Sequence, residues 1–270
     1  MYFIINLPSP LCAAVGFAIE SSNIVGYNTV TLQPGYNMLS VSFKNVENNA
    51  EGIAVDDIFP GGGVASSLQA GTGAGSADKI MIYTNDGIGG GDYSTYFLYK
   101  AAKSSAKDYW WVNSSLNLSG LKFKNGDSFW FYRRGSTSVT ATVSGEVELT
   151  AATNVTLQTG YNMIGNYFPT GLVLNDDIYT ASFWQNSGAA AGTGAGAADK
   201  ILVYTNDGVG GGDYATYFLY KAAKTSAKDY TWVNSSLNQV TTPVSNPGQG
   251  VWYYHRGTGM TLPLHMPASN

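Results

Sequence analysis

Charged side chains are scarce in this 270-residue chain. Asp, Glu, Lys and Arg make up 12% of it, roughly half of the ~25% that is usual in soluble proteins. The 14 Lys and Arg are spread along the sequence and are outnumbered by 18 Asp and Glu, which gives a net charge of −4. Because no basic stripe is available to neutralise phosphates, the sequence argues against a nucleic-acid partner.

Cysteine is nearly absent as well. Cys12 is the single cysteine, so no disulfide can form within the chain. A metal site built from several thiolates is excluded, and so is a thiol nucleophile that occurs twice in the chain. We interpret Cys12 as a small buried hydrophobic residue, and a bridge between two molecules is the alternative.

Long apolar runs are missing apart from residues 1–20, MYFIINLPSPLCAAVGFAIE. Pro8 and Pro10 interrupt this segment, so it is too broken to span a membrane. Its apolar run and small residues resemble a signal peptide, but it lacks the Lys or Arg expected near the start. Two outcomes stay open: the segment is removed as a signal peptide, or it is retained as an apolar arm. We expect that it is retained.

The rest of the composition favours β-structure. Gly, Ser, Thr, Asn and Tyr are abundant, with 33 Gly and 19 Tyr in the chain. Such a mixture of turn formers with β-branched and aromatic residues suits strands that are joined by tight loops.

The sequence also repeats itself. Residues 70–117 and 191–238 differ at 7 of 48 positions and are identical at the other 41. Shorter matches flank this block: VTLQPGYNML with VTLQTGYNMI, AVDDIF with LNDDIY, and FWFYRRG with VWYYHRG. Each unit has roughly 120 residues, a usual domain size. We therefore predict an apolar N-terminal arm (1–23), a first repeat (24–149) and a second repeat (150–270).

Inside a unit the pattern is that of strands. Apolar and polar residues alternate from Val139 to Leu149, which predicts a half-buried strand. The short apolar runs KIMIYT and YFLYK are typical of buried strands, and TNDGIGGGDY between them suits a wide hairpin loop. KAAKSSAKD is too short for a stable helix and predicts a loop or a single turn.

These patterns predict an all-β fold of two tandem antiparallel β-sandwich domains, jelly-roll or immunoglobulin-like, with about six to eight strands each. Pro263 and Pro267 cannot donate ladder hydrogen bonds, so we expect the last strand at a sheet edge or in an irregular terminus.

Three segments carry a resemblance to a known group of proteins. IVGYNTVTLQPGYNML (24–39), the strand beginning Asp-Lys-Ile (78–80) and NPGQGVWYYHRG (246–257) resemble exported bacterial β-repeat proteins. Those proteins open with VGYxxVTLxxGYNM, close with a PGQGFW-like motif and are largely uncharacterised. SGEVEL (144–149) fits the strand that ends their units. The resemblance implies export and an all-β fold, and this chain departs from it in having two units and an N-terminal arm.

The duplicated glycine-rich loops offer candidate metal ligands. Asp86 and Asp92 flank the first loop, and Asp207 and Asp213 flank the second. Carboxylates in flexible loops are ligands that Ca²⁺ takes. The spacing matches neither an EF-hand nor a GGxGxD repeat, so turn formation is the competing interpretation and no metal or cofactor is assigned firmly.

The pairs Asp56–Asp57 and Asp176–Asp177 are also duplicated. Adjacent side chains on a strand point to opposite faces, which would prevent such a pair from acting as acid and base. A turn would instead let the two carboxylates share a cation.

No residue set argues for catalysis, and we predict that the chain is not an enzyme. Nothing in the sequence places a serine and a carboxylate beside His255 or His265, and the glycine-rich segments lack the Lys-Ser/Thr of a phosphate loop. A glycosidase would need two carboxylates about 5–10 Å apart, and no such pair is singled out. The difference between Arg133 and His255 is expected at an exposed or terminal position.

Aromatic residues recur in both repeats: Tyr93, Tyr96, Tyr99, Tyr109, Trp110 and Trp111, then Tyr214, Tyr217, Tyr220, Tyr230 and Trp232. Core packing with cross-strand pairs is one interpretation, and a surface stripe that meets a sugar or another subunit is the other. Trp110 is replaced by Thr231 in the second repeat, so its contact is not duplicated, and we expect it to be exposed.

We expect a secreted, self-assembling structural subunit of an extracellular filament, tube or surface layer, with copies of itself as partners. The arm would add a strand to a neighbour, and such head-to-tail contacts build open polymers. The interface candidates are apolar arm residues and the unduplicated tryptophan: Tyr2, Phe3, Ile4, Ile5, Leu7, Leu11, Val15, Phe17 and Trp110. The alternative is a cell-surface carbohydrate-binding module or adhesin, with a glycan as partner. Both interpretations place the chain outside the cell or on its surface, without an integral membrane span.

Overall fold

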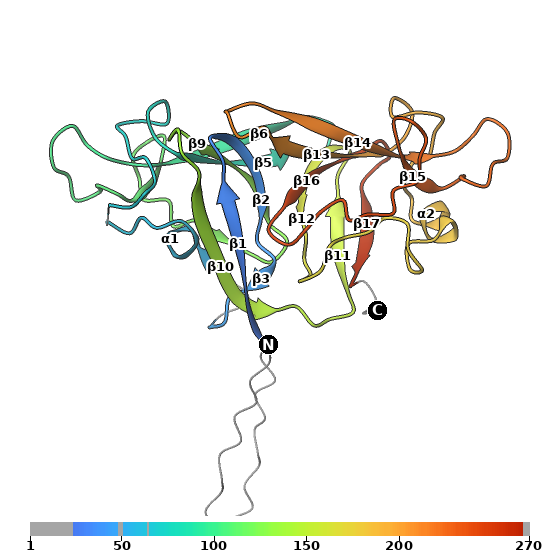
Figure 1. Cartoon of the computed structure of the whole chain (residues 1–270), viewed down its shortest axis with the longest axis horizontal. Coiled ribbons are helices and arrows are strands. Elements are labelled where there is room, and N and C mark those ends of the chain that lie inside the picture. Colours follow the sequence, from blue (N-terminus) through green and yellow to red (C-terminus); the bar gives the residue numbers. More distant parts are fainter. Residues whose placement is uncertain (1–23, 48–50, 64, 267–270) are drawn as a thin grey trace, which may run out of the picture.

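The structure, a computed structural model, describes residues 24–47, 51–63 and 65–266 and is built almost wholly from antiparallel β-strands (Figure 1). In the first repeat the strands are β1 (Val25–Leu32), β2 (Gly35–Ser40), β3 (Phe43–Lys44), β4 (Ile53–Ala54), β5 (Lys79–Asn85), β6 (Gly91–Leu98), β7 (Trp111–Asn113), β8 (Lys122–Phe123), β9 (Ser128–Arg133) and β10 (Val139–Val147), with the short helix α1 (Val55–Ile58). In the second repeat they are β11 (Ala152–Leu157), β12 (Gly160–Gly165), β13 (Lys200–Asn206), β14 (Gly212–Tyr220), β15 (Thr231–Asn234), β16 (Gly250–His255) and β17 (Met260–His265), with the helix α2 (Ala181–Asn186). The predicted all-β fold is confirmed.

Each repeat holds one large sheet of the same design. The order is β2-β9-β5-β6-β7 in the first repeat and β12-β16-β13-β14-β15 in the second. A smaller sheet faces each large one, β1-β10-β3 in the first repeat and β11-β17 in the second. Every pairing between named strands joins two strands of the same repeat, although the division into two domains itself stays a prediction.

Strand β10 shows why these residues form sheets. Ala141 and Val143 face the core while Thr140 and Thr142 face solvent, because successive side chains of a strand point to opposite faces. The predicted half-buried strand is therefore confirmed. The segment KAAKSSAKD forms a turn rather than a helix, as its length predicts.

The core of each repeat lies between its large and its small sheet. In the first repeat, Phe129 and Phe131 of the large sheet pack with Val143 of the small one. In the second, Tyr253 and Leu264 lie in the corresponding cluster. The helices α1 and α2 lie on opposite sides of the molecule in Figure 1 and add buried side chains to these two clusters.

The expected number of strands was wrong for the first repeat, and the structure also settles where the paired Asp residues lie. The first repeat has ten strands among its described residues rather than six to eight, and three of them (β3, β4 and β8) are only two residues long. Asp56 and Asp57 lie in the first turn of α1, not on a strand, where acidic residues suit the positive end of a helix. Asp176 lies in a bend, and its Oδ1 accepts hydrogen bonds from the backbone N–H groups of Ile178 and Tyr179 at 2.9 and 2.7 Å.

The two repeats meet along a seam. The large sheets lie side by side across the top of the molecule in Figure 1, and Leu39 forms an isolated antiparallel bridge with Gln249 across the seam. The backbone N–H of Ser40 donates to the carbonyl of Gly248 at 2.9 Å.

The glycine-rich hairpin of each repeat also clasps the other repeat. Asn85, at the end of β5, donates from Nδ2 to the carbonyls of Thr159 and Tyr161 at 2.9 and 2.7 Å. In the same way Asn206, at the end of β13, donates to the carbonyls of Pro34 and Tyr36 at 2.8 and 2.6 Å. The contacts are reciprocal, as in the isologous interface of a two-fold symmetric dimer.

No helix in the described part of the chain is long and apolar enough to cross a membrane.

The expected edge position of the last strand is confirmed, because β17 pairs with β11 alone.

Candidate functional site

The outer faces of the two large sheets carry an aromatic set at the seam. On β5, Ile80 and Ile82 point into the core of the first repeat, so Met81 and Tyr83 point to the opposite face. On β9, Trp130 lies between the core residues Phe129 and Phe131 and also points outward. In the second repeat, the side chains that point to the outer face in the same way are Leu202, Tyr204 and Trp252.

These outer faces pack against each other through a small apolar cluster. Met38, Trp130 and Trp252 are buried there, and Met163 packs against them. Both repeats contribute, so neither could form this cluster alone.

Above the cluster lies a first aromatic pocket of about 270 Å³. It is lined by side chains of both repeats: Tyr83, Tyr93, Tyr161, Leu202, Tyr214 and Trp252. The Trp252 ring meets Tyr83 and Tyr161 edge to face, with ring centroids 5.0 and 5.7 Å apart.

A second pocket of about 380 Å³ lies beside it. Each of its lining residues is the counterpart, in the other repeat, of a residue that lines the first pocket: Tyr36, Met81, Tyr93, Trp130, Tyr204 and Tyr214. The Trp130 ring meets Tyr204 and Tyr36 edge to face, with centroids 4.9 and 5.7 Å apart. Tyr93 and Tyr214 line both pockets, which are therefore contiguous. We call the two pockets together the aromatic platform.

Tyr93 and Tyr214 are half exposed, whereas the tryptophans of the platform are buried and form its floor. The exposed fraction is 49% for Tyr93 and 45% for Tyr214, against 6% for Trp130 and 7% for Trp252. Burial raises the pKa of the Tyr93 and Tyr214 phenols, and a hydrogen bond with the neighbouring tryptophan opposes that shift. Both phenols therefore stay neutral at physiological pH and can donate and accept hydrogen bonds.

Backbone contacts fix the orientation of two other rings. The Tyr83 hydroxyl donates to the carbonyl of Gly90 at 2.8 Å, and the Tyr204 hydroxyl donates to that of Gly211 at 2.9 Å. Each glycine belongs to the hairpin loop that contacts the other repeat. The same loop therefore joins the two repeats and orients a tyrosine in the wall of a pocket.

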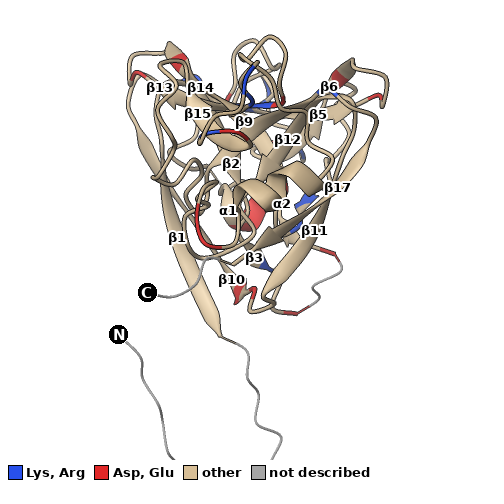
Figure 2. Cartoon of the chain, turned by 90° about the vertical axis from the view of Figure 1, so that its right-hand side faces the viewer, with Lys and Arg blue, Asp and Glu red and all other residues tan. Residues whose placement is uncertain are grey.

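Charges of both signs border the platform. Lys200 lies 5.9 Å from the ring centroid of Tyr161 and 5.0 Å from that of Tyr254. At the hairpin side, burial and then the carboxylates of Asp86 and Asp92 raise the pKa of Tyr83. Figure 2 shows acidic residues at the tips of the β5–β6 and β13–β14 hairpins.

Two more grooves follow the seam. One has a volume of about 450 Å³ and is bordered by Asp127, Tyr167 and Asn85. Its counterpart, of about 310 Å³, has Gln249 and Asn206 at its border. The Asp127 carboxylate accepts a hydrogen bond from the backbone N–H of Lys124 at 2.7 Å, so it serves the local turn.

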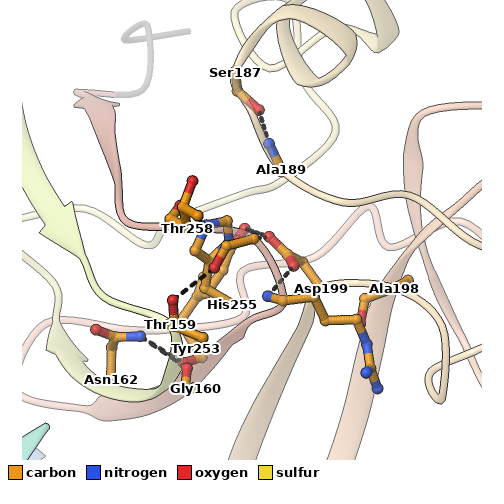
Figure 3. A network of polar contacts seen from close by, with 12 residues as sticks. Thr159, Gly160, Asn162, Ser187, Ala189, Ala198, Asp199, Tyr253, His255 and Thr258 are labelled. Carbon is orange, nitrogen blue, oxygen red and sulfur yellow. Dashed lines mark hydrogen bonds and ion pairs between the residues drawn. The ribbon is translucent and has the colours of Figure 1, made fainter. Parts of the chain in front are cut away.

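A buried polar network lies inside the second repeat (Figure 3). Asp199 Oδ2 is 2.8 Å from His255 Nδ1 and accepts a hydrogen bond from the Tyr253 hydroxyl at 3.0 Å. His255 Nε2 lies 2.8 Å from the carbonyl of Thr258. Both ring nitrogens thus face oxygen acceptors, which suits the imidazolium, and the hydrogen bond to Asp199 raises the pKa of His255.

This network is an ion pair rather than a catalytic set. The side chains of His255 and Asp199 are both 0% exposed, so no substrate can reach them. In the first repeat the same place is taken by Arg133, whose Nη1 is 2.5 Å from Asp78 Oδ2. The expectation that Arg133 and His255 differ at an exposed position was therefore wrong, because both are buried.

Of the four candidate calcium ligands, Asp86 and Asp207 serve the hairpin turns, whereas Asp92 and Asp213 lie near the start of β6 and β14. Asp86 Oδ1 accepts from the backbone N–H groups of Ile88 and Gly90, both at 2.9 Å, and Asp207 makes the same pair of contacts in its own loop. Within the described ranges, no group of three or more His, Cys, Asp or Glu could hold a metal ion.

The predicted interface residues have different outcomes. Trp110 is half-buried, not fully exposed. The arm candidates from Tyr2 to Phe17 lie outside the described residues.

The recurring aromatics divide between core and surface. Trp111 and Trp232 are buried, as core packing predicts, whereas Tyr93 and Tyr214 line the platform. Sequence reasoning missed the other platform residues: Tyr36, Tyr83 and Trp130, with Tyr161, Tyr204 and Trp252. The available signal was their position in duplicated strands, where they alternate with core residues.

The chain matches no protein-family model, and neither the curated proteins nor the solved structures contain a match to it. The resemblance to exported β-repeat proteins stays a prediction.

Proposed function

We propose that the chain is a carbohydrate-binding protein that uses the aromatic platform as its binding surface. The observation that carries this proposal is the pair of contiguous pockets, in which half-exposed tyrosines stand over a floor of tryptophan.

The chemistry of the platform suits a sugar. Pyranose rings present apolar C–H faces, which pack on aromatic rings, and hydroxyl groups at their edges, which need hydrogen-bond partners. Tyrosine and tryptophan combine a large apolar face with a polar group. Apolar pockets with a few placed polar groups are the usual form of a small-molecule site.

A glycan array tests this proposal. The wild-type chain is expected to bind a defined set of glycans, and the double substitution Tyr93→Ala/Tyr214→Ala is expected to abolish binding, because both rings line both pockets. Tyr27→Ala is the matched control, since Tyr27 is a 76% exposed tyrosine on β1 that lines neither pocket. Absence of binding by the wild type, or full binding by the double variant, would contradict the proposal.

A second candidate function is the structural subunit of an extracellular polymer. One observation favours it: β1 is an edge strand, and its first residues are exposed, with Val25 at 59%. Edge strands are templates for an added strand, and β1 starts directly after the apolar segment 1–23.

Deletion of residues 1–23 tests this second candidate. We expect the full chain to form polymers in negative-stain images and the shortened chain to remain monomeric. Polymers of unchanged form after the deletion would refute arm exchange.

A further inference from the structure

The aromatic platform has an internal symmetry that bears on its ligand. Exchange of each residue for its counterpart in the other repeat converts the lining of the first pocket into that of the second. Only Leu202 and Met81 differ between the two linings, and both are unbranched at Cβ and apolar. Two pockets with corresponding linings, of about 270 and 380 Å³, predict two subsites for the same kind of ligand.

The subsites are also joined. Tyr93 and Tyr214 each line both pockets, so a ligand that leaves one pocket passes directly over rings that belong to the other. A ligand of one or two rings fills one pocket, whereas a longer chain is in place to occupy both.

The charges around the first pocket indicate a neutral ligand. The first pocket has Lys200 beside Tyr161 on one side and Asp86 and Asp92 near Tyr83 on the other. Within the described part of the chain, Lys200 forms no ion pair with a carboxylate. A charged ligand of either sign meets repulsion at one side, whereas a neutral polyol finds donors at one side and acceptors at the other.

We infer that the platform consists of two equivalent, contiguous subsites and that its ligand is a neutral glycan chain that runs across both. The inference rests on the proposed carbohydrate-binding function. Beyond that function, it fixes the stoichiometry: one chain binds two short ligands or one long ligand.

Isothermal titration calorimetry tests the inference with neutral di- and hexasaccharides of the gluco, manno and xylo series (cellobiose and cellohexaose, and their mannose and xylose equivalents). For a series that binds, we expect two disaccharides but one hexasaccharide per chain. The hexasaccharide should bind at least tenfold more tightly, because its second contact is intramolecular.

Two variants disable one subsite each. Tyr161 lines only the first pocket and Tyr36 only the second. Tyr161→Ala and Tyr36→Ala are each expected to reduce the disaccharide stoichiometry from two to one and to remove the advantage of the hexasaccharide. Circular dichroism and Tyr27→Ala control for folding and for loss of an exposed tyrosine elsewhere.

The outcomes separate the two claims. If no saccharide, neutral or charged, binds the wild type, the proposed function fails and this inference with it. If saccharides bind with a stoichiometry of one at both lengths, or if a hexauronate binds more tightly than every neutral hexasaccharide, the inference alone is overturned.

Discussion

One residue difference between the repeats changes the chemistry of a buried ion pair. Asp78 pairs with Arg133 in the first repeat, and Asp199 pairs with His255 in the second. Arginine keeps its charge at every accessible pH, whereas histidine loses it near neutrality. The second repeat therefore has a pH-dependent contribution to stability that the first lacks.

The direction of this dependence follows from the pKa of His255, which is raised in the folded chain by Asp199. The ion pair contributes fully below about pH 6.5, the unfolded pKa of histidine. Its contribution is lost as the pH rises through the higher folded pKa. We expect His255→Arg to remove this loss, so that the free energy of unfolding falls less between pH 5.5 and pH 8.5 than in the wild type.

Urea unfolding at the two pH values measures this difference. His265, on the last strand, offers a control: His265→Gln leaves the Asp199 pair intact and should retain the wild-type dependence. Equal pH dependence in the wild type and in His255→Arg would show that the buried pair does not titrate in this range.

At the level of elements, the glycine-rich hairpins hold the seam together. Gly160, the first residue of β12, has φ +87°, and a Cβ on it would lie 2.7 Å from the Cα of Gly89 in the opposite hairpin loop. The counterpart Gly35 has φ +83° and meets the backbone of Gly210 in the same way. Glycine is required here both for the left-handed conformation and for the close approach of two loops.

Gly160→Ala is therefore expected to lower the free energy of unfolding by about 2 kcal/mol or more, from left-handed strain and overpacking together. Gly194→Ala is the matched control, because a Cβ at Gly194 meets nothing within 4 Å and its φ is not in the left-handed range. Its effect should stay within about 0.5 kcal/mol. Chemical denaturation measures both, and equal losses would contradict a tight seam at Gly160.

The strands themselves were predictable, but the seam was not. The apolar run around Ile80–Tyr83 indicates a strand covered on both faces, and both faces are indeed covered. Periodicity gives the face of each side chain, yet it carries no information on which distant surface covers that face. The role of Asn85 was hidden for the same reason, because its amide bonds to Thr159 and Tyr161 across the seam.

At the scale of the whole molecule, the duplication builds one shared surface. The buried Met38, Trp130 and Trp252 join the repeats, and the exposed tyrosines above them form the platform. The repeats differ where Trp110 is replaced by Thr231 and where Arg133 is replaced by His255. None of these residues lines either pocket. The repeats therefore agree in the linings of the two pockets apart from Leu202 and Met81, as two corresponding subsites require.

Saturation-transfer NMR tests the central claim, that sugar rings lie on these aromatic side chains, most directly. Irradiation of the aromatic protons of the chain should transfer saturation to C–H protons on one face of a bound neutral hexasaccharide. In Tyr93→Ala/Tyr214→Ala the transfer should vanish, while in Tyr27→Ala it should persist. Transfer of equal strength in the double variant, or none in the wild type, would contradict the account.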